Sequence, residues 1–123
     1  MSKSPSKQLV ETYLDGFRAN DHDKILDCLS DDVEWTVFGH FYLTGKEAYG
    51  NAIEGPGFVG PPQLEVVRMV EEGNIVMAEL LGWAPQEAGE PVRLSMAEVF
   101  VIRDGKIAER RAWVIPLTEN RHR

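Results

Sequence analysis

The second half of the chain is a run of four strand-like segments with short connections, and this run limits the possible folds more than any other feature. Period-two alternation and β-branched residues predict strands over residues 63–71, 74–83, 92–103 and 106–116. Asp104-Gly105, between the last two, is a strong signal for a two-residue hairpin turn. Consecutive strands joined by such short turns predict an antiparallel sheet.

The first half of the chain predicts helices that can cover such a sheet. Apolar residues recur at helical spacing over residues 6–19, which indicates an amphipathic helix. Asp21 or Asp23 can cap a second short helix whose inner positions are Ile25, Leu26 and Leu29, and residues 30–32 end it.

Two short strands and a third helix are expected between these halves. Residues 33–38 and 41–43 favour strands joined at Gly39 into a hairpin. Thr44 and Glu47 have the spacing of a capping box, which predicts a third helix through Ile53. Three Gly and three Pro within residues 55–62 predict a loop.

The order of these elements indicates an α+β fold rather than alternating parallel α/β units. Both faces of the strand at residues 96–102 are apolar. Because helices on one side of the sheet would leave the other face bare, we expect a homodimer through the outer face, including Val99, Val101 and Trp113.

Charge and composition exclude several classes of function. Thirteen Lys and Arg against twenty Asp and Glu give a net charge of −7, the wrong sign for binding nucleic acid. No apolar run is long enough to span a membrane and no signal peptide is visible, so we expect a cytoplasmic protein that contacts no membrane. The single cysteine, Cys28, is expected to be a buried thiol, and without nucleotide or metal motifs we expect no cofactor and no metal.

The sequence resembles the nuclear-transport-factor-2-like (NTF2-like) superfamily, which includes ketosteroid isomerase, SnoaL-type polyketide cyclases and limonene epoxide hydrolase. The resemblance lies in Tyr13-Leu14 with Phe17, residues 19–33, Thr44-Gly45 and the hairpin at residues 99–111, and it covers most of residues 8–116. It implies a curved, mixed but mainly antiparallel sheet wrapped around three N-terminal helices into a cone with an internal pocket. We expect one such domain over residues 1–123, with flexible ends at 1–5 and 117–123.

The resemblance also implies site residues. Ketosteroid isomerase moves a proton with a carboxylate base, while a Tyr and a protonated acid hold the substrate oxygen. Tyr13 and Glu98 match the latter two, but the position of the base is Val37, which cannot accept a proton. The positions of the epoxide hydrolase residues resemble Met77, Glu79 and Ala112, of which only Glu79 is a carboxylate. The acid of the cyclases also falls near Ala112.

The residues themselves leave alternatives open for each catalytic candidate. Glu98 and Glu79 stand among apolar neighbours on their strands, so burial would raise the pKa of a carboxyl there, yet either can instead form an ion pair with Arg110, Arg68 or Arg93. Tyr13 is either a hydrogen-bond donor to a substrate oxygen or a tyrosine of the core. His40 is a candidate replacement base or an exposed histidine of the turn.

Large apolar side chains are candidates for the walls of the pocket or for the core. The predicted ligand-binding residues are Trp35, Phe38, Phe58, Trp83, Met96 and Val114. Phe58 lies in the Gly/Pro loop, where it can act as part of a lid.

Two functions therefore remain possible. One is a cofactor-free isomerase, cyclase or hydratase that acts on a small, apolar, oxygenated molecule through Tyr13, Glu98, Glu79 and His40. The other is a non-catalytic module of the same fold that binds a ligand or a protein. If the protein is an enzyme of this type, Tyr13 and Glu98 should converge on one empty point. If the two residues belong to an ordinary core, side chains should fill that point.

Overall fold

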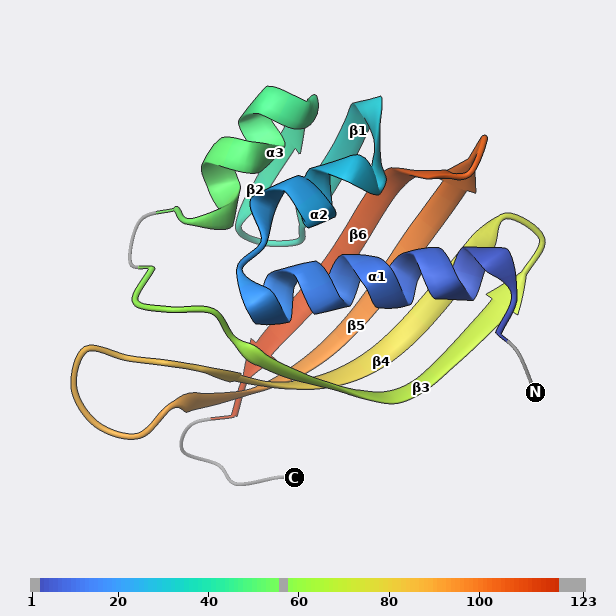
Figure 1. The fold of residues 1–123 in the computed structure, drawn as a ribbon. Helices are drawn as coiled ribbons and strands as arrows, with labels where there is room; N and C mark the ends of the chain where they lie inside the picture. The colour runs from blue at the N-terminus through green and yellow to red at the C-terminus, as the bar shows by residue number, and fades with distance from the viewer. Residues whose placement is uncertain (1–2, 56–57, 118–123) are drawn as a thin grey trace.

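The first helix lies across one face of a curved sheet in the computed structural model, which describes residues 3–55 and 58–117 (Figure 1). Helix α1 spans Pro5–Ala19, as the periodicity predicts. Ser4 caps it by accepting a hydrogen bond from the backbone N–H of Lys7 at 3.1 Å, and Asn20 ends it in the left-handed conformation. Its buried side includes Tyr13, which has no exposed surface.

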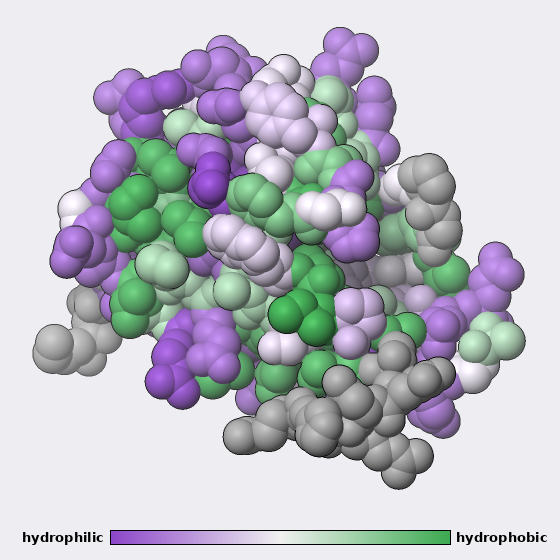
Figure 2. All heavy atoms as spheres, turned by 180° about the vertical axis from the view of Figure 1, so that it is seen from behind, coloured by the Kyte–Doolittle hydropathy of each residue, from purple (hydrophilic) through white to green (hydrophobic). Residues whose placement is uncertain are grey.

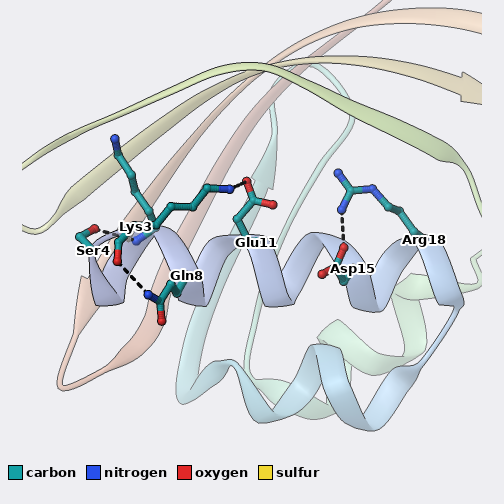
Figure 3. Close-up of polar contacts among 7 residues, drawn as sticks. Lys3, Ser4, Gln8, Glu11, Asp15 and Arg18 are labelled. Carbon is teal, nitrogen blue, oxygen red and sulfur yellow. Dashed lines mark hydrogen bonds and ion pairs between the residues drawn. The ribbon is translucent and has the colours of Figure 1, made fainter. Parts of the chain in front are cut away.

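The outer side of α1 carries polar contacts (Figure 3). Lys3 pairs with Glu11 at 2.9 Å, and Arg18 pairs with Asp15 at 2.6 Å. Arg18 Nε also donates to the carbonyl oxygen of Leu64 at 3.0 Å, which links the end of the helix to the sheet. Exposed ion pairs of this kind add little stability, so the apolar side of α1 fixes its position.

Helix α2 spans His22–Asp27, and Asp21 caps it through the N–H of Lys24. The prediction that Leu29 belongs to this helix is wrong, because strand β1 begins there and spans Leu29–Val37. The N–H of Ile107 donates to the carbonyl oxygen of Cys28 at 2.8 Å, and Leu29 pairs with Ile107 in the sheet. Strand pairing therefore takes the chain out of the helix.

Helix α3 spans Lys46–Ile53, but the predicted capping box is not formed. The residue at the N-cap is Gly45 at φ 90°, and no side chain caps the helix. Thr44 instead ends strand β2 (Phe41–Thr44), where it pairs with Glu34. Burial of Tyr49 and Ile53 still holds α3 against the sheet.

The sheet has six strands in the order β2-β1-β6-β5-β4-β3. The remaining strands are β3 (Gln63–Glu72), β4 (Ile75–Ala84), β5 (Val92–Arg103) and β6 (Lys106–Pro116). Only β1 and β6 run parallel; the other neighbours are antiparallel. The predicted α+β class, the mixed curved sheet and the hairpin at Asp104-Gly105 are confirmed.

The two faces of the sheet differ as alternation requires. On β5, Met96, Glu98 and Phe100 point inward and are buried. On the outer face Trp113 is 38% exposed, as predicted, and stacks on Phe38 with 4.7 Å between the ring centres. Seen from behind the sheet, hydrophobic residues lie among polar ones across this face (Figure 2).

The predicted flexible ends fall largely outside the described residues, which omit residues 1–2 and 118–123. Within the described part, Pro5 is the first residue of α1, and the flexibility of both ends stays a prediction. Leu117 donates its N–H to the carbonyl oxygen of Arg93 at 2.8 Å.

Cys28 is buried as predicted, and burial raises the pKa of its thiol. Among the described residues, none of the helices has the length and apolarity that crossing a membrane requires. The cytoplasmic location stays a prediction.

Two glycines in helices give a matched test of this packing. A Cβ on Gly16 would lie 2.7 Å from Ile25 Cγ1 and 3.2 Å from the Ile25 backbone nitrogen, so Gly16→Ala forces α1 and α2 apart. We expect it to lower the free energy of unfolding by about 1–3 kcal/mol. A Cβ added to Gly50 would lie 3.6 Å from its nearest neighbour, Leu26 Cδ1, which is an ordinary van der Waals contact. Gly50→Ala should raise stability by about 0.5–1 kcal/mol. Urea unfolding of both variants measures the difference, and equal effects would contradict the close contact.

Candidate functional site

A cavity of about 550 Å³ opens at the end of the molecule where α1 and α3 finish (left in Figure 1). Phe17 of α1, Phe41 of β2 and Leu94 of β5 form parts of its wall, and the loop before β3 contributes Phe58. Among the described residues the lining contains no charged side chain, and its only polar side chains are asparagines, Asn20 and Asn51. Such a lining suits a neutral, mostly apolar molecule.

One edge of this opening is held by a polar cluster. Glu54 follows α3, and its Oε2 accepts a hydrogen bond from Asn20 Nδ2 at 3.0 Å and lies 2.7 Å from His22 Nε2. The hydrogen bonds from Asn20 and His22 lower the pKa of Glu54. The cluster joins the turn between α1 and α2 to the start of the loop that walls the cavity.

The two residues that match the oxyanion-binding pair of ketosteroid isomerase lie deeper in the molecule. Leu94 and Glu98 share the inner face of β5, so Glu98 lies roughly 13 Å further along the strand. Tyr13 lies one helical turn before Phe17 on α1. Both residues are therefore beyond the cavity wall, and the cavity lining includes neither.

The guanidinium of Arg110 lies between Tyr13 and Glu98. Arg110 Nε and Nη2 donate to the two carboxylate oxygens of Glu98, each at 2.8 Å, and Nη1 donates to the hydroxyl of Tyr13 at 2.6 Å. Tyr49 shares a short hydrogen bond with the same hydroxyl. Both oxygens of Glu98 accept from the guanidinium, so the carboxyl group is engaged by Arg110 rather than directed at an open space.

Burial sets the ionisation of this cluster. It raises the pKa of Tyr13 well above its ordinary value and raises that of Tyr49 too, against the opposing charge of Arg110. Burial alone would lower the pKa of Arg110, but the charge of Glu98, its hydrogen bond to Arg110 and the two tyrosines together outweigh burial, and the pKa lies well above its ordinary value. In neutral solution Tyr13 and Tyr49 therefore keep their hydroxyl protons and Arg110 keeps its charge.

Aromatic rings surround the cation. Arg110 Cζ lies 4.7 Å from the centre of the Trp35 ring and 5.3 Å from that of Phe17. Trp35 stacks on Tyr49 with 4.3 Å between ring centres. Trp35, only 6% exposed, thus stands between the buried cluster and the cavity.

Two other catalytic candidates lie elsewhere. Glu79 points to the outer face of the sheet, opposite to Glu98, and pairs with Arg68 at 2.9 Å. Its alternation with buried Ala78 and Leu80 places it outside, and its ion pair with Arg68 is one of the alternatives that the sequence left open. His40 is exposed in the turn between β1 and β2 and is not part of the cavity lining.

Of the six predicted ligand-binding residues, only Phe58 lines the cavity. Trp35 and Met96 are buried in the core, and Val114 packs against that core. Phe38 lies on the outer face with Trp113, because it follows the last inward residue of β1, Val37. Trp83 lies on the same, outer face of β4 as Met77 and Glu79, because side chains two residues apart on a strand share a face. It does not line the cavity.

Sequence reasoning included Arg110 as one alternative partner of Glu98 and missed Tyr49 and most of the cavity wall. Tyr49 stands at an inner position of α3, and only the packing of α3 beside α1 brings its hydroxyl to Tyr13. The Gly/Pro loop at residues 55–62 was the sequence signal that could have located the cavity wall, because several of its residues, including the predicted Phe58, line the cavity. Within residues 3–55 and 58–117, no group of three or more His, Cys, Asp or Glu is arranged to hold a metal ion.

Two glutamates on opposite faces of the sheet give a matched test of the buried cluster. Glu98→Gln leaves the Arg110 cation buried without a countercharge, and we expect it to lower the free energy of unfolding by about 3 kcal/mol. Glu79→Gln breaks an exposed pair and should cost less than about 1 kcal/mol. Chemical denaturation measures both variants. A loss for Glu98→Gln no larger than that for Glu79→Gln would contradict the assigned ion pair.

Comparisons with known proteins place this geometry in a family. The model of the SnoaL-like domain matches residues 10–110. A search of curated proteins gives no match.

Solved structures share the fold at low identity. An epoxide hydrolase from Mycobacterium tuberculosis, described as LEH-like, is 21% identical with a TM-score of 0.80, covering 90% of this chain and 83% of its own. An NTF2-like protein of unknown function from Cytophaga hutchinsonii is 15% identical with a TM-score of 0.76, covering 93% of each chain.

A third solved structure contains a ligand. RV0760c from Mycobacterium tuberculosis, in complex with estradiol-17beta-hemisuccinate, is 16% identical with a TM-score of 0.76 and covers 89% of this chain and 93% of its own. These likenesses show the cone fold, and the matched family model covers most of the sequence. The chain belongs to the SnoaL-like domain family.

Proposed function

We propose that this protein binds a small, neutral, largely apolar molecule in the cavity beside Phe17, Phe41, Phe58 and Leu94. The observation that carries the proposal is the combination of an open 550 Å³ cavity with a filled space between Tyr13 and Glu98. The first offers room for a ligand, and the second removes the empty point that acid-base chemistry at these two residues requires.

The filled space favours binding over catalysis. A donor pair of the ketosteroid isomerase type needs two protons directed at one substrate oxygen. Here the Glu98 oxygens both accept from Arg110, and the Tyr13 hydroxyl is engaged by Arg110 and Tyr49. With Val37 at the position of the base, we infer that this chain does not use the family's isomerase chemistry.

The lining determines the class of ligand. An uncharged wall offers no partner to a carboxylate or an ammonium. Moving a charged group from water to such a wall costs on the order of several kcal/mol of binding free energy, because the charge stays unpaired. Phe and Leu side chains offer apolar contact, while Asn20 and Asn51 can meet one polar group. The steroid in the RV0760c complex matches the apolar part of this class but not its neutrality, because its hemisuccinate carries a carboxylate.

A pair of steroids tests the cavity. Estradiol is neutral, whereas estradiol-17beta-hemisuccinate carries a carboxylate on the same skeleton. We expect the protein to bind estradiol and to bind the hemisuccinate about tenfold more weakly, because no cation lines the wall. Titration by tryptophan fluorescence or calorimetry measures both affinities. Equal or tighter binding of the hemisuccinate would contradict a neutral ligand.

Two alanine substitutions provide the matched control. Ala84 lines the cavity, so Ala84→Phe fills part of it and should weaken estradiol binding at least about tenfold. Ala97 lies on the outer face of β5, and Ala97→Phe should leave the affinity unchanged. If neither variant alters estradiol binding, the ligand occupies another part of the protein.

We also propose that the outer sheet face joins two copies of the chain. Val99 and Val101 lie there beside Met77, which is 48% exposed, and Trp113, which is 38% exposed. Such a row of apolar side chains on an open sheet face favours a covered surface, and aromatic residues are enriched in interfaces.

Light scattering tests the dimer. The chain should have twice its own mass at high micromolar concentration, and Val99→Arg should make it a monomer because it places a charge in the interface. Val59 is exposed in the loop before β3 and is not part of this face, so the Val59→Arg variant should remain dimeric. A monomeric parent protein would refute the interface.

A further inference from the structure

Trp35 holds a buried hydrogen-bond donor with no acceptor. Its indole Nε1 is inaccessible to solvent and makes no hydrogen bond within the described part of the chain. More than nine in ten buried polar groups in proteins have a partner, so an unpaired donor in the core requires a specific explanation. Leaving such a group unpaired costs about 1–3 kcal/mol.

The groups that touch the Trp35 ring cannot supply the acceptor. Tyr49 stacks on it and directs its hydroxyl to Tyr13. Arg110 lies 4.7 Å from the ring centre and is a cation with donors only. The aromatic and cationic contacts hold the indole in place and leave its N–H unsatisfied.

The remaining ring contacts of Trp35 lead to the cavity. Phe41 packs edge-on against it at 5.0 Å and 81°, and Phe17 does so at 6.3 Å and 75°. Both phenylalanines line the cavity. The indole is therefore one side chain behind the wall, and an opening of that wall would bring a ligand to it.

Phe41 is the movable part of this wall. It is 40% exposed and lies on β2, the short edge strand, whereas Phe17 is partly buried on α1. A rotation of the Phe41 side chain about its own χ1 needs no change in the core, because one side of the ring already faces solvent. Such a rotation removes one of the two phenylalanine rings that separate Trp35 from the cavity.

We propose that the Trp35 indole N–H is the donor that selects the ligand of this cavity, a neutral apolar molecule with an oxygen acceptor such as a ketone carbonyl. An indole N–H donates and never accepts, so it distinguishes a carbonyl from an ammonium group or a plain hydrocarbon, neither of which has an acceptor. The charge-free wall excludes a carboxylate as the acceptor. This inference rests on the proposed function and adds to it the group that gives specificity.

The test uses two probes with the same carbon skeleton, 2-tetralone and tetralin, with the full chain. In the parent protein labelled with nitrogen-15, the Trp35 indole resonance should move downfield with 2-tetralone and stay in place with tetralin. Trp35→Phe keeps an aromatic ring but removes the donor. It should weaken 2-tetralone binding roughly threefold to tenfold and leave tetralin binding within about twofold.

Trp83→Phe is the matched control, because Trp83 does not line the cavity, and it should change neither affinity. If tetralone moves the resonances of Ala84 and Leu94 but not the Trp35 indole, and Trp35→Phe binds it normally, the donor role is refuted while the cavity stands. If neither probe moves Ala84 or Leu94, the proposed function fails, and this inference fails with it. The indole measurement on the parent protein decides the matter even if Trp35→Phe does not fold.

Discussion

The ion pair between Arg110 and Glu98 is the interaction on which the interior of this protein depends. Arg110 is 9% exposed and Glu98 only 1%, so each charge would be strongly destabilising without the other. Their bidentate contact, completed by Tyr13, connects two sheet strands to α1. Rings of Trp35 and Phe17 close around the cation and exclude water from it. The centre of the cone is thus a satisfied polar core.

The position of this core decides where a ligand can be held. The guanidinium of Arg110 fills the space between Tyr13 and Glu98, and the open volume lies beside Leu94, about 13 Å along β5 from Glu98. The chain shares the scaffold of the SnoaL-like family, and a shared scaffold does not by itself fix the chemistry of a site. A family name therefore predicts this architecture far better than it predicts an activity.

Local sequence signals failed where strand pairing competed with them. Leu29 fits the helical pattern of α2, and Thr44 with Glu47 fits a capping box, yet both Leu29 and Thr44 belong to strands. In each case a backbone partner in the sheet supplies hydrogen bonds that the local motif cannot match. The four long strands, by contrast, were predicted to within a residue or so, because alternation and turn residues agree there.

Alternation along the strands, read from the sequence by itself, determined only which residues share a face: Glu98 lies with Met96 and Phe100, and Trp113 lies opposite Ala112. Because both faces of β5 are apolar, the tertiary structure had to decide which of them is buried. Only the tertiary structure decided what Glu98 meets. The register of β5 and β6 sets Glu98 opposite Ala112 and so makes Arg110 its diagonal neighbour. Tyr13 and Tyr49 reach the same point from helices 36 residues apart in sequence. Contacts of this kind depend on how separate elements pack, and no periodicity within one element encodes them.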